Sequence, residues 1–454
     1  MSGGARRDFV IRPATRPLVG GVPVPSDKSI SHRAILLGAL AAGPSEVGGF
    51  SYGGDNVSTL EIFRRMGVVV DDDGAGTLRV HGVGLRGLCE PDGPLDCGNS
   101  GTTMRVLAGV LAAQPFRAVM VGDASLSRRP MSRVAAPLRR RGAVVEGEFH
   151  PTKAGEITPP LVIGPLPAGA ALMESDESLA VASAQVKSAL LLSGLYAEGN
   201  TYVREPLLSR DHTERMLKAL GVPLSTVASA VELDAARFDG SLPAFSLQIP
   251  GDLSAAAFLL VAAHLVPESR VSVRGVGLNP TRAGVLDYLR ARSASLTVEE
   301  RADALGEPVG ELHVAYTPLG GGLLAGELLT RAIDEVPALC ALAARSRGRT
   351  EIADAAELRV KESDRLAVMA SVLRAFGVDC EERPDGMTIE GRPEAPLTAA
   401  DVESHGDHRI AMSAALLGLV ADGETRVRDV ACVGTSFPRF AGTLRALGAE
   451  VDVV

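Results

Sequence analysis

The chain has 454 residues, of which 46% are hydrophobic and 22% are charged, and its formal net charge is −9. This length exceeds what one hydrophobic core usually serves, so we expect two or three domains of a globular protein. The acidic balance argues against nucleic acid as a partner, because a polyanion needs a basic face. No uncharged apolar run is long enough for a membrane span, so no membrane partner is expected.

The five cysteines form no CxxC pair, and the sequence therefore predicts neither a zinc site nor a disulfide framework. The first residues, MSGGARRDFVIRPATRP, lack the apolar segment of a secretory signal. Both features fit a cytoplasmic protein. No dinucleotide fingerprint or Walker loop is present, so we expect no cofactor and no metal.

A two-part pattern recurs six times along the chain. Its first part predicts a helix of small apolar residues followed by a β-branched strand, at 31–47, 102–121, 185–203, 253–273, 335–352 and 408–427. Its second part predicts an amphipathic helix and a short strand, at 56–70, 131–146, 211–224, 281–298, 363–380 and 440–453. The apolar helices should be buried and the amphipathic helices should lie outside them.

In five of the six copies a glycine follows the amphipathic helix, and it predicts a left-handed C-cap. These glycines are Gly67, Gly142, Gly221, Gly377 and Gly448, and the fourth copy lacks one. Six copies could form a solenoid. We favour two globular domains of three copies each, because the copies are long and diverged and their charged motifs recur at helix starts.

The apolar helices begin at unusual segments. These are Pro25–Ser29, Gly98–Thr102, Ser183–Gln185 and Gly406–Arg409. A helix N-terminus offers free N–H groups and the positive end of a dipole, which together hold anions. The alternative is that the Ser, Asn and Asp residues serve only as N-caps. Basic residues at or near these starts favour an anion site.

Two further segments carry clustered charges. Ser29 and Arg33 share a helix face beside Lys28, which suits a phosphate. In RVKESDR, the spacing of Lys361 and Arg365 predicts two cations one helical turn apart, with Glu362 beside them as a potential proton donor or acceptor. A salt-bridged surface helix is the alternative for this segment.

Asp334 and Glu335 precede the apolar run that starts at Val336. Acidic residues at a helix start often interact only with the dipole. One that faced a substrate hydroxyl would be a candidate base. For His408 a structural role is the commoner outcome.

Seven motifs resemble those of 5-enolpyruvylshikimate-3-phosphate synthases, in the same order and over nearly the whole chain. They are SDKSISHRAILLGAL, LDCGNSGTTMRVLAG, GDASLSRRPMSR, SAQVKSALLLSG, SRDHTERM, RVKESDRL and GDHRIAM. The resemblance implies an α/β fold of two inside-out domains, each of three βαβαββ repeats with buried helices, joined by a two-stranded hinge. It implies a first, discontinuous domain of residues 1–24 and 250–454, a second domain of residues 25–249, and an active site in the cleft between them.

The resemblance also implies the reaction, in which the enolpyruvyl group of phosphoenolpyruvate moves to the 5-hydroxyl of shikimate 3-phosphate. It implies shikimate 3-phosphate contacts at Lys28, Ser29, Arg33, Ser183, Ala184, Gln185, Arg210, Asp334 and Lys361. It implies phosphoenolpyruvate contacts at Lys28, Gly101, Arg129, Gln185, Arg365 and Arg409. Asp334 is expected to act as the base and Glu362 as the acid, and Lys28 is expected to contact both substrates and to share in the proton transfers.

Ala184 and Thr435 match the SAQ variety of the family, because other members have a second serine and a lysine at these positions. The resemblance further implies a monomer that glyphosate inhibits. Two other assignments are possible. A UDP-N-acetylglucosamine enolpyruvyl transferase usually has a loop cysteine, which the stretch Gly122–Arg133 lacks. A non-catalytic six-repeat ring around nucleic acid conflicts with the net charge.

Overall fold

The computed structural model describes residues 7–167 and 169–454. The chain divides into two compact units, each of which is described separately. Unit 1 comprises the residues up to Pro25 together with Pro250–Ala302 and Pro308–Val454, and unit 2 comprises Ser26–Ile249 and Asp303–Glu307.

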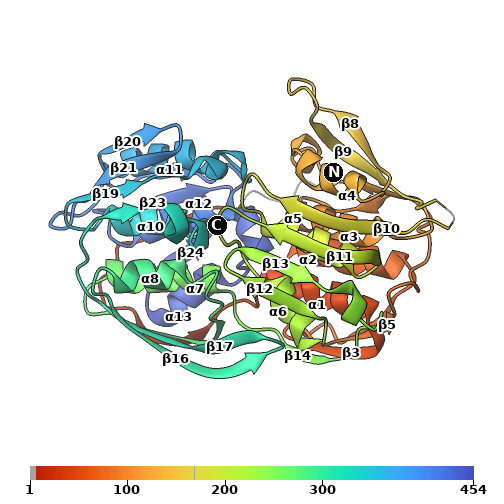
Figure 1. Ribbon diagram of the computed structural model, residues 1–454. Coiled ribbons are helices and arrows are strands. Elements are labelled where there is room, and N and C mark those ends of the chain that lie inside the picture. Colours follow the sequence, from red (N-terminus) through yellow and green to blue (C-terminus); the bar gives the residue numbers. More distant parts are fainter. Residues whose placement is uncertain (1–6, 168) are drawn as a thin grey trace. The chain divides into compact units, whose positions relative to one another are not determined.

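Each unit contains three four-stranded sheets of one topology, as predicted from the repeats (Figure 1). In every sheet the first two strands are parallel and the third pairs antiparallel with the second. In spatial order the sheets of unit 2 are β14 (Ser246–Gln248), β3 (Ala42–Gly48), β5 (Leu78–Val83), β4 (Val69–Asp72); β6 (Leu95–Asp96), β7 (Ala118–Val121), β9 (Ile157–Ile163), β8 (Val145–Phe149); and β10 (Leu172–Ser178), β11 (Ala197–Arg204), β13 (Ala230–Leu233), β12 (Leu224–Val227).

The sheets of unit 1 follow the same order. They are β2 (Val19–Pro23), β15 (Arg270–Gly277), β17 (Glu307–Ala315), β16 (Ser295–Ala304); β18 (Leu323–Leu324), β19 (Arg349–Ile352), β21 (Gly386–Glu390), β20 (Cys380–Arg383); and β22 (Asp401–Glu403), β23 (Thr425–Arg428), β1 (Phe9–Ile11), β24 (Val451–Val453). The N-terminal strand β1 therefore lies between β23 and β24, the last two strands of the chain, and is antiparallel to both.

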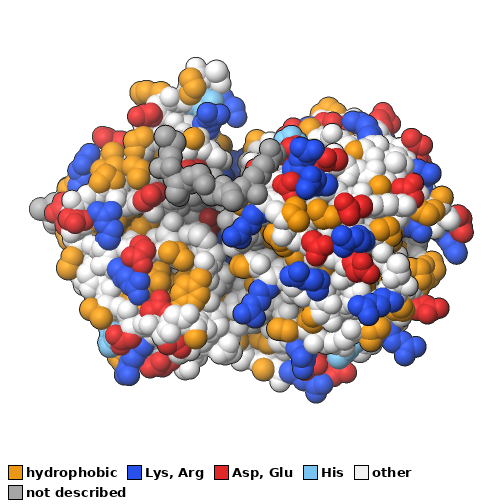
Figure 2. All heavy atoms as spheres, turned by 180° about the vertical axis from the view of Figure 1, so that it is seen from behind, with side chains coloured by type: hydrophobic (Ala, Val, Ile, Leu, Met, Phe, Trp, Pro, Cys, Tyr) orange, Lys and Arg blue, Asp and Glu red, His pale blue; other side chains and the backbone are white. Residues whose placement is uncertain are grey.

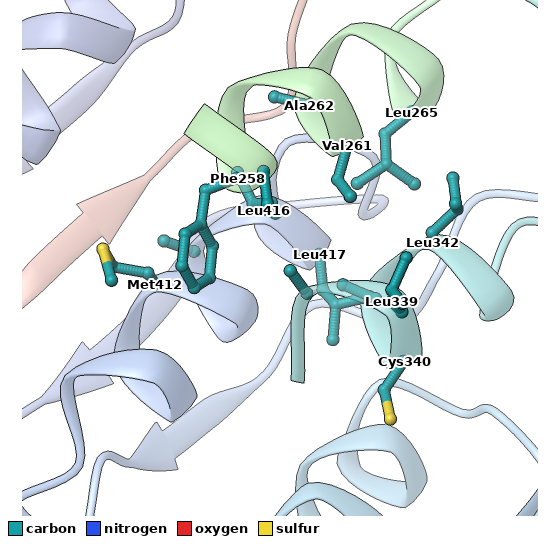
Figure 3. Packing of buried hydrophobic residues seen from close by; sticks show 14 of the residues in the cluster. Phe258, Val261, Ala262, Leu265, Leu339, Cys340, Leu342, Met412, Leu416 and Leu417 are labelled. Carbon is teal, nitrogen blue, oxygen red and sulfur yellow. The ribbon is translucent and has the colours of Figure 1, made fainter. Parts of the chain in front are cut away.

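The apolar helices form the centre of each unit, which confirms the inside-out arrangement. In unit 2 they are α1 (Lys28–Leu40), α3 (Gly101–Leu111) and α5 (Ala184–Gly194), and in unit 1 they are α7 (Leu253–Leu265), α10 (Val336–Ala343) and α12 (His408–Gly418). Every residue of α7 and α10 is buried. In unit 1, side chains from all three helices meet, with Phe258, Leu339 and Leu416 among them (Figure 3). Burial of such a side chain contributes about 1.5–3 kcal/mol.

The amphipathic helices each keep an exposed face. They are α2 (Gly54–Arg65), α4 (Ser132–Arg140), α6 (His212–Ala219), α8 (Gly284–Arg290), α11 (Arg365–Ala375) and α13 (Phe440–Leu447). The remaining helical segments are short: α9 (Gly326–Arg331) and the 3-10 turns η1 (Leu126–Arg128), η2 (Ala235–Arg237), η3 (Ala356–Val360) and η4 (Val430–Thr435).

The glycines that follow the amphipathic helices have positive φ angles, between 73° and 113°, as the sequence predicted. Near the end of α8, in the copy that lacks the glycine, Ser293 takes φ 57° instead. A left-handed residue therefore follows the helix in all six copies, and in one copy a serine bears the strain of that conformation.

Charged side chains of both signs are interspersed on the face shown in Figure 2. Within residues 7–167 and 169–454, no helix is both long enough and apolar enough to cross a membrane.

Candidate active site

The four predicted helix starts are all N-terminal ends of buried helices. Each is capped by its own side chain: Asp27 accepts from the N–H of Ile30, Ser100 from Thr103, Ser183 from Val186 and Asp407 from Arg409. Capping therefore explains why Ser and Asp stand at these positions. It does not explain the basic residues that surround them.

In unit 2, three predicted residues gather around one arginine that the sequence analysis did not single out. Arg105, one turn into α3, donates to Gln185 Oε1 at 2.7 Å and to the carbonyl oxygen of Pro130 at 3.1 Å. Arg129 donates to the carbonyl and side-chain oxygens of Asn99 at 3.2 and 2.6 Å. A Cβ atom on Gly101 would lie 2.9 Å from Arg105 Nη1 and 3.3 Å from Arg129 Nη1. Gly101 thus lies directly against two guanidinium groups.

Gln185 is held on both sides of its amide. Its oxygen accepts from Arg105, and its nitrogen donates to Thr102 Oγ1 at 2.9 Å. The amide orientation is thereby fixed. Ser183 and Ala184 begin the same helix, and the backbone N–H of Ser183 donates to Glu205 Oε1 at 2.7 Å.

The start of α1 carries the other predicted cations of unit 2. Lys28 forms an ion pair with Asp55 on α2, with 2.5 Å between Nζ and Oδ2. Arg33 is buried and donates to Thr213 Oγ1 at 2.7 Å, to the carbonyl oxygen of Ser29 at 2.9 Å and to Ser188 Oγ at 2.9 Å. These three bonds fix the guanidinium in place.

Several charges act on Arg33. Burial lowers the pKa of its guanidinium, and the positive charge of Arg210 acts in the same direction. Glu214, Asp27 and Glu307 oppose this effect. Arg210 is thus one of four charged neighbours that act on Arg33, and the other three are acidic.

In unit 1, three carboxylates surround Arg365, which is buried at the start of α11. Its Nε lies 2.8 Å from Asp407 Oδ2, its Nη2 lies 2.7 Å from Glu362 Oε2, and its Nη1 lies 3.3 Å from Asp334 Oδ1. Burial alone would raise the pKa of the Asp407 carboxyl, but Arg365 more than offsets this effect and holds that pKa below its usual range.

Asp334 lies among three cations. Besides Arg365, Lys361 Nζ is 4.0 Å from its Oδ1 and Arg409 Nη2 is 3.8 Å from its Oδ2. Arg409 also donates to the backbone carbonyl oxygen of Asp334 at 2.8 Å. Its neighbour Glu335 is instead buried and accepts from the hydroxyl of Ser254. Of the two acidic residues, Asp334 is the one that lies beside Lys361, Arg365 and Arg409.

One local expectation was wrong. Lys361 and Arg365 do not lie a turn apart on one helix, because the Asp364 side chain caps α11 by accepting from the N–H of Ala367 and the helix begins only at Arg365. Lys361 follows the short turn η3 and approaches Asp334 from a non-helical segment. His408 is buried, and burial followed by the charge of Arg409 lowers its pKa to about 4, which fits a structural role.

The predicted site residues divide into two sets, one in each unit. The unit 2 set contains Lys28, Ser29, Arg33, Gly101, Arg129, Ser183, Ala184, Gln185 and Arg210. The unit 1 set contains Asp334, Lys361, Glu362, Arg365 and Arg409. The unit 2 set is rich in cations and helix N-termini and suits phosphate and carboxylate groups. The unit 1 set adds carboxylates held by cations, which suits proton transfer close to an anion.

Sequence reasoning missed Arg105 and Asp407. Arg105 stands four residues after Gly101, a spacing that places both on one helix face, so a signal was present. Asp407 was seen only as part of a helix start, and nothing in the sequence indicated that it contacts Arg365.

The fold and the two sets define a six-repeat α/β protein built to bind small phosphorylated or carboxylated molecules. The sequence model described as EPSP synthase (3-phosphoshikimate 1-carboxyvinyltransferase) matches residues 13–444. The chain belongs to the EPSP synthase family.

Individual relatives agree with this assignment. The chain is 49% identical to a 3-phosphoshikimate 1-carboxyvinyltransferase from Geobacter metallireducens over 98% of this chain and 100% of the relative. It is 48% identical to a 3-phosphoshikimate 1-carboxyvinyltransferase from Acidithiobacillus ferrooxidans, over 98% of this chain and 99% of the relative. A solved EPSP synthase structure from Acinetobacter baumannii superposes with a TM-score of 0.88, at 43% identity, over 99% of this chain and 100% of that one.

Proposed function

We propose that this chain transfers the enolpyruvyl group of phosphoenolpyruvate to the 5-hydroxyl of shikimate 3-phosphate and releases phosphate, a step of aromatic amino acid biosynthesis. Membership of the family over nearly the full length carries the proposal. The cations and carboxylates of the two sets have the chemistry that the reaction needs. Release of inorganic phosphate that requires both substrates together would support it. Release with UDP-N-acetylglucosamine in place of shikimate 3-phosphate would overturn it.

We assign the residues by their resemblance to the family. Shikimate 3-phosphate contacts Lys28, Ser29, Arg33, Ser183, Ala184, Gln185, Arg210, Asp334 and Lys361. Phosphoenolpyruvate contacts Lys28, Gly101, Arg129, Gln185, Arg365 and Arg409. These assignments draw on both sets, so the proposal requires that both units act on one pair of substrates in a cleft. The grouping of Gly101, Arg129 and Gln185 around Arg105 supports the assignment within unit 2.

The proposed reaction is an addition followed by an elimination. Glu362 gives a proton to the methylene carbon of phosphoenolpyruvate, and the electron-poor C2 that results is attacked by the substrate 5-hydroxyl. Asp334 takes the hydroxyl proton, and we assign Lys28 a share in these transfers by its resemblance to the family. The C–O bond to phosphate then breaks, the methyl carbon returns a proton to the Glu362 carboxylate, and the enol ether forms. Fixed Arg and Lys side chains stabilise the charges of the intermediate.

Arg409 should matter more for phosphoenolpyruvate than for shikimate 3-phosphate. Arg409→Ala removes a charge-assisted contact to the anion, which typically contributes about 1.5–3 kcal/mol. We therefore expect phosphoenolpyruvate affinity to fall by roughly 10- to 150-fold, with shikimate 3-phosphate affinity nearly unchanged. Calorimetric titration with each substrate measures both effects. Equal losses of affinity for the two substrates would show that Arg409 has a structural role instead, through its hydrogen bond to the backbone carbonyl oxygen of Asp334.

Gly101 should set sensitivity to glyphosate, which we propose binds in the phosphoenolpyruvate pocket. The methyl group of Gly101→Ala would push against Arg105 and Arg129, whose ends must move by a few tenths of an ångström. Glyphosate is the longer ligand, so crowding should weaken it more, by about 1–3 kcal/mol. We expect a strongly raised inhibition constant and a smaller rise in the KM for phosphoenolpyruvate. Equal weakening of both ligands would contradict this.

Three finer properties complete the proposal. Ala184 and Thr435 support the SAQ variety, and Thr435 donates its hydroxyl to the carbonyl oxygen of Cys432 at 2.7 Å. We also propose a monomer in the cytoplasm. Sedimentation equilibrium tests the monomer, since a concentration-dependent mass would contradict it.

A further inference from the structure

A buried carboxylate joins two segments of unit 2 that carry proposed shikimate 3-phosphate contacts. Glu205 directly follows β11, and its side chain is fully buried. Its Oε1 accepts from the backbone N–H of Ser183, the residue that caps α5, at 2.7 Å. The same carboxylate accepts from the hydroxyl of Ser209 at 2.7 and 2.8 Å and from its backbone N–H at 3.2 Å. Glu205 therefore connects the start of α5 to the residue directly before Arg210.

A buried lysine binds the same carboxylate. The Nζ atom of Lys187 lies 2.7 Å from Glu205 Oε2, 2.9 Å from Glu214 Oε1 and 3.3 Å from the carbonyl oxygen of Ser209. An ammonium group has three hydrogens, and these three acceptors use all of them. Burial alone would lower the pKa of Lys187, but Glu214 and Glu205 more than offset this effect and raise it, so the lysine is charged. Because Lys187 belongs to α5, it ties that helix to Ser209 a second time.

The network itself is closed to a ligand, but the residues that it holds are not. Glu205 is 5% exposed and Lys187 is 1% exposed. Ser183 and Arg210, in contrast, are both partly exposed, so a ligand can reach them. The carboxylate can therefore act on a bound anion only through the places in which it holds these two residues.

We propose that Glu205 is a positioning residue for shikimate 3-phosphate, which acts by holding the start of α5 and the segment of Arg210 in fixed relative positions. The inference rests on the proposed function, because that function assigns Ser183 and Arg210 to this substrate. Phosphoenolpyruvate binding should depend on Glu205 much less, since Gln185 is fixed separately by its hydrogen bonds to α3.

Glu205→Gln gives the sharpest test. The amide keeps the shape of the side chain but has only one acceptor oxygen. That oxygen can face either the N–H of Ser183 or the N–H of Ser209, so one of the two segments loses its acceptor. We expect the Kd and KM for shikimate 3-phosphate to rise by about 5- to 20-fold, with the KM for phosphoenolpyruvate within about twofold and kcat within about threefold of the wild type. Calorimetric titration and steady-state phosphate release measure these values.

Glu214→Gln is the matched control. Glu214 is 4% exposed and pairs with the same lysine, but its Oε2 has no hydrogen-bond partner among the described residues and its Oε1 pairs with Lys187. The variant removes the same charge from the lysine and leaves the bonds of Glu205 to both segments. Its loss also makes the surroundings of Arg33 more positive, which should not weaken the binding of an anion. The KM for shikimate 3-phosphate should therefore not rise.

Both glutamine variants should fold, because two buried carboxylates share one lysine. Burial raises the pKa of Glu214 although Lys187 opposes this effect, so the cluster holds its second negative charge at a cost. Either substitution leaves one lysine paired with one carboxylate. Urea denaturation shows whether each variant is folded.

A second pair of variants keeps every charge of the cluster. Ser209→Ala removes only the hydroxyl that donates to Glu205, and we expect the KM for shikimate 3-phosphate to rise by about 2- to 5-fold. Ser175→Ala is the same substitution on β10 of unit 2, where the buried hydroxyl has no hydrogen-bond partner among the described residues. Both KM values of the Ser175 variant should stay at the wild-type level.

The outcomes are separable. An unchanged affinity for shikimate 3-phosphate in folded Glu205→Gln, equal rises in both KM values, or the same rise in Glu214→Gln would overturn the role of Glu205. If Glu205→Gln does not fold, an unchanged KM for shikimate 3-phosphate in Ser209→Ala overturns it instead. A wild-type protein that releases no phosphate from the two substrates would overturn the proposed function itself, and titration with shikimate 3-phosphate would still decide the role of Glu205.

Discussion

Replacement of Asp334 by asparagine is expected to lower turnover by about 10²- to 10⁴-fold, the usual contribution of a positioned acid–base group. The amide keeps the shape of the carboxylate but cannot accept the proton of the substrate hydroxyl. Asp334 lies within 4.0 Å of Lys361, Arg365 and Arg409, so its neighbours hold it in one place. Single-turnover phosphate release measures the loss, and equilibrium titration should still detect shikimate 3-phosphate binding.

Asp364→Asn is the matched control for this variant. Asp364 caps α11 and pairs with Arg359, and asparagine is as good a cap as aspartate. The turnover of the Asp364→Asn variant should therefore remain within a few-fold of the wild type. If Asp334→Asn also retained near-normal turnover, Asp334 would not be the base.

Replacement of Arg365 by methionine is expected to lower the free energy of unfolding of unit 1 by about 3–5 kcal/mol, since it leaves the buried carboxylate of Asp407 without its cation. Three carboxylates form ion pairs with this side chain, which is 2% exposed. Activity should be lost as well, because the proposed phosphoenolpyruvate contact disappears. Urea denaturation at neutral pH measures the stability change.

The effect of Arg365→Met should depend on pH. Arg365 holds the pKa of Asp407 below its usual range despite burial, so the stability from this pair is present above the ordinary carboxyl value of about 3.9 and is lost as pH falls through the lowered folded value. In the variant, the carboxyls can escape repulsion by taking up protons. The difference between variant and wild type should therefore shrink between pH 7 and acid pH.

Arg359→Met serves as the comparison. Arg359 also pairs with two carboxylates, Asp364 and Glu382, but its side chain is 26% exposed. Its removal should change stability by only about 0–1 kcal/mol. Equal losses for Arg359 and Arg365 would show that burial does not set the size of the effect.

The repeat architecture was predictable because helix composition and left-handed caps are local signals. The apolar stretch of α7 and the glycine after α2 each identify their element without any distant contact. Ser293 shows that a glycine is not required for this cap. The backbone there takes the same left-handed conformation, although the sequence has no glycine from which to predict it.

The site residues were predictable mainly through motif resemblance, and their contacts were not. The contact between Arg365 and Asp407 joins residues 42 positions apart, and Glu205 joins the start of α5 to the segment before Arg210. No local periodicity encodes such contacts. The prediction that Lys361 and Arg365 share a helix was wrong for a local reason. It placed Asp364 inside a helix, whereas Asp364 is the N-cap and the helix begins at Arg365.

The position of β1 has a consequence for the order in which the protein is built. Phe9–Ile11 leave the ribosome more than 400 residues before Thr425–Arg428 and Val451–Val453, the two strands with which they pair. Ser26–Ile249, nearly all of unit 2, is contiguous and can fold during synthesis. The third sheet of unit 1 cannot close until Val451–Val453 have been synthesised, so a truncation after Glu450 would leave one edge of β1 without its neighbour.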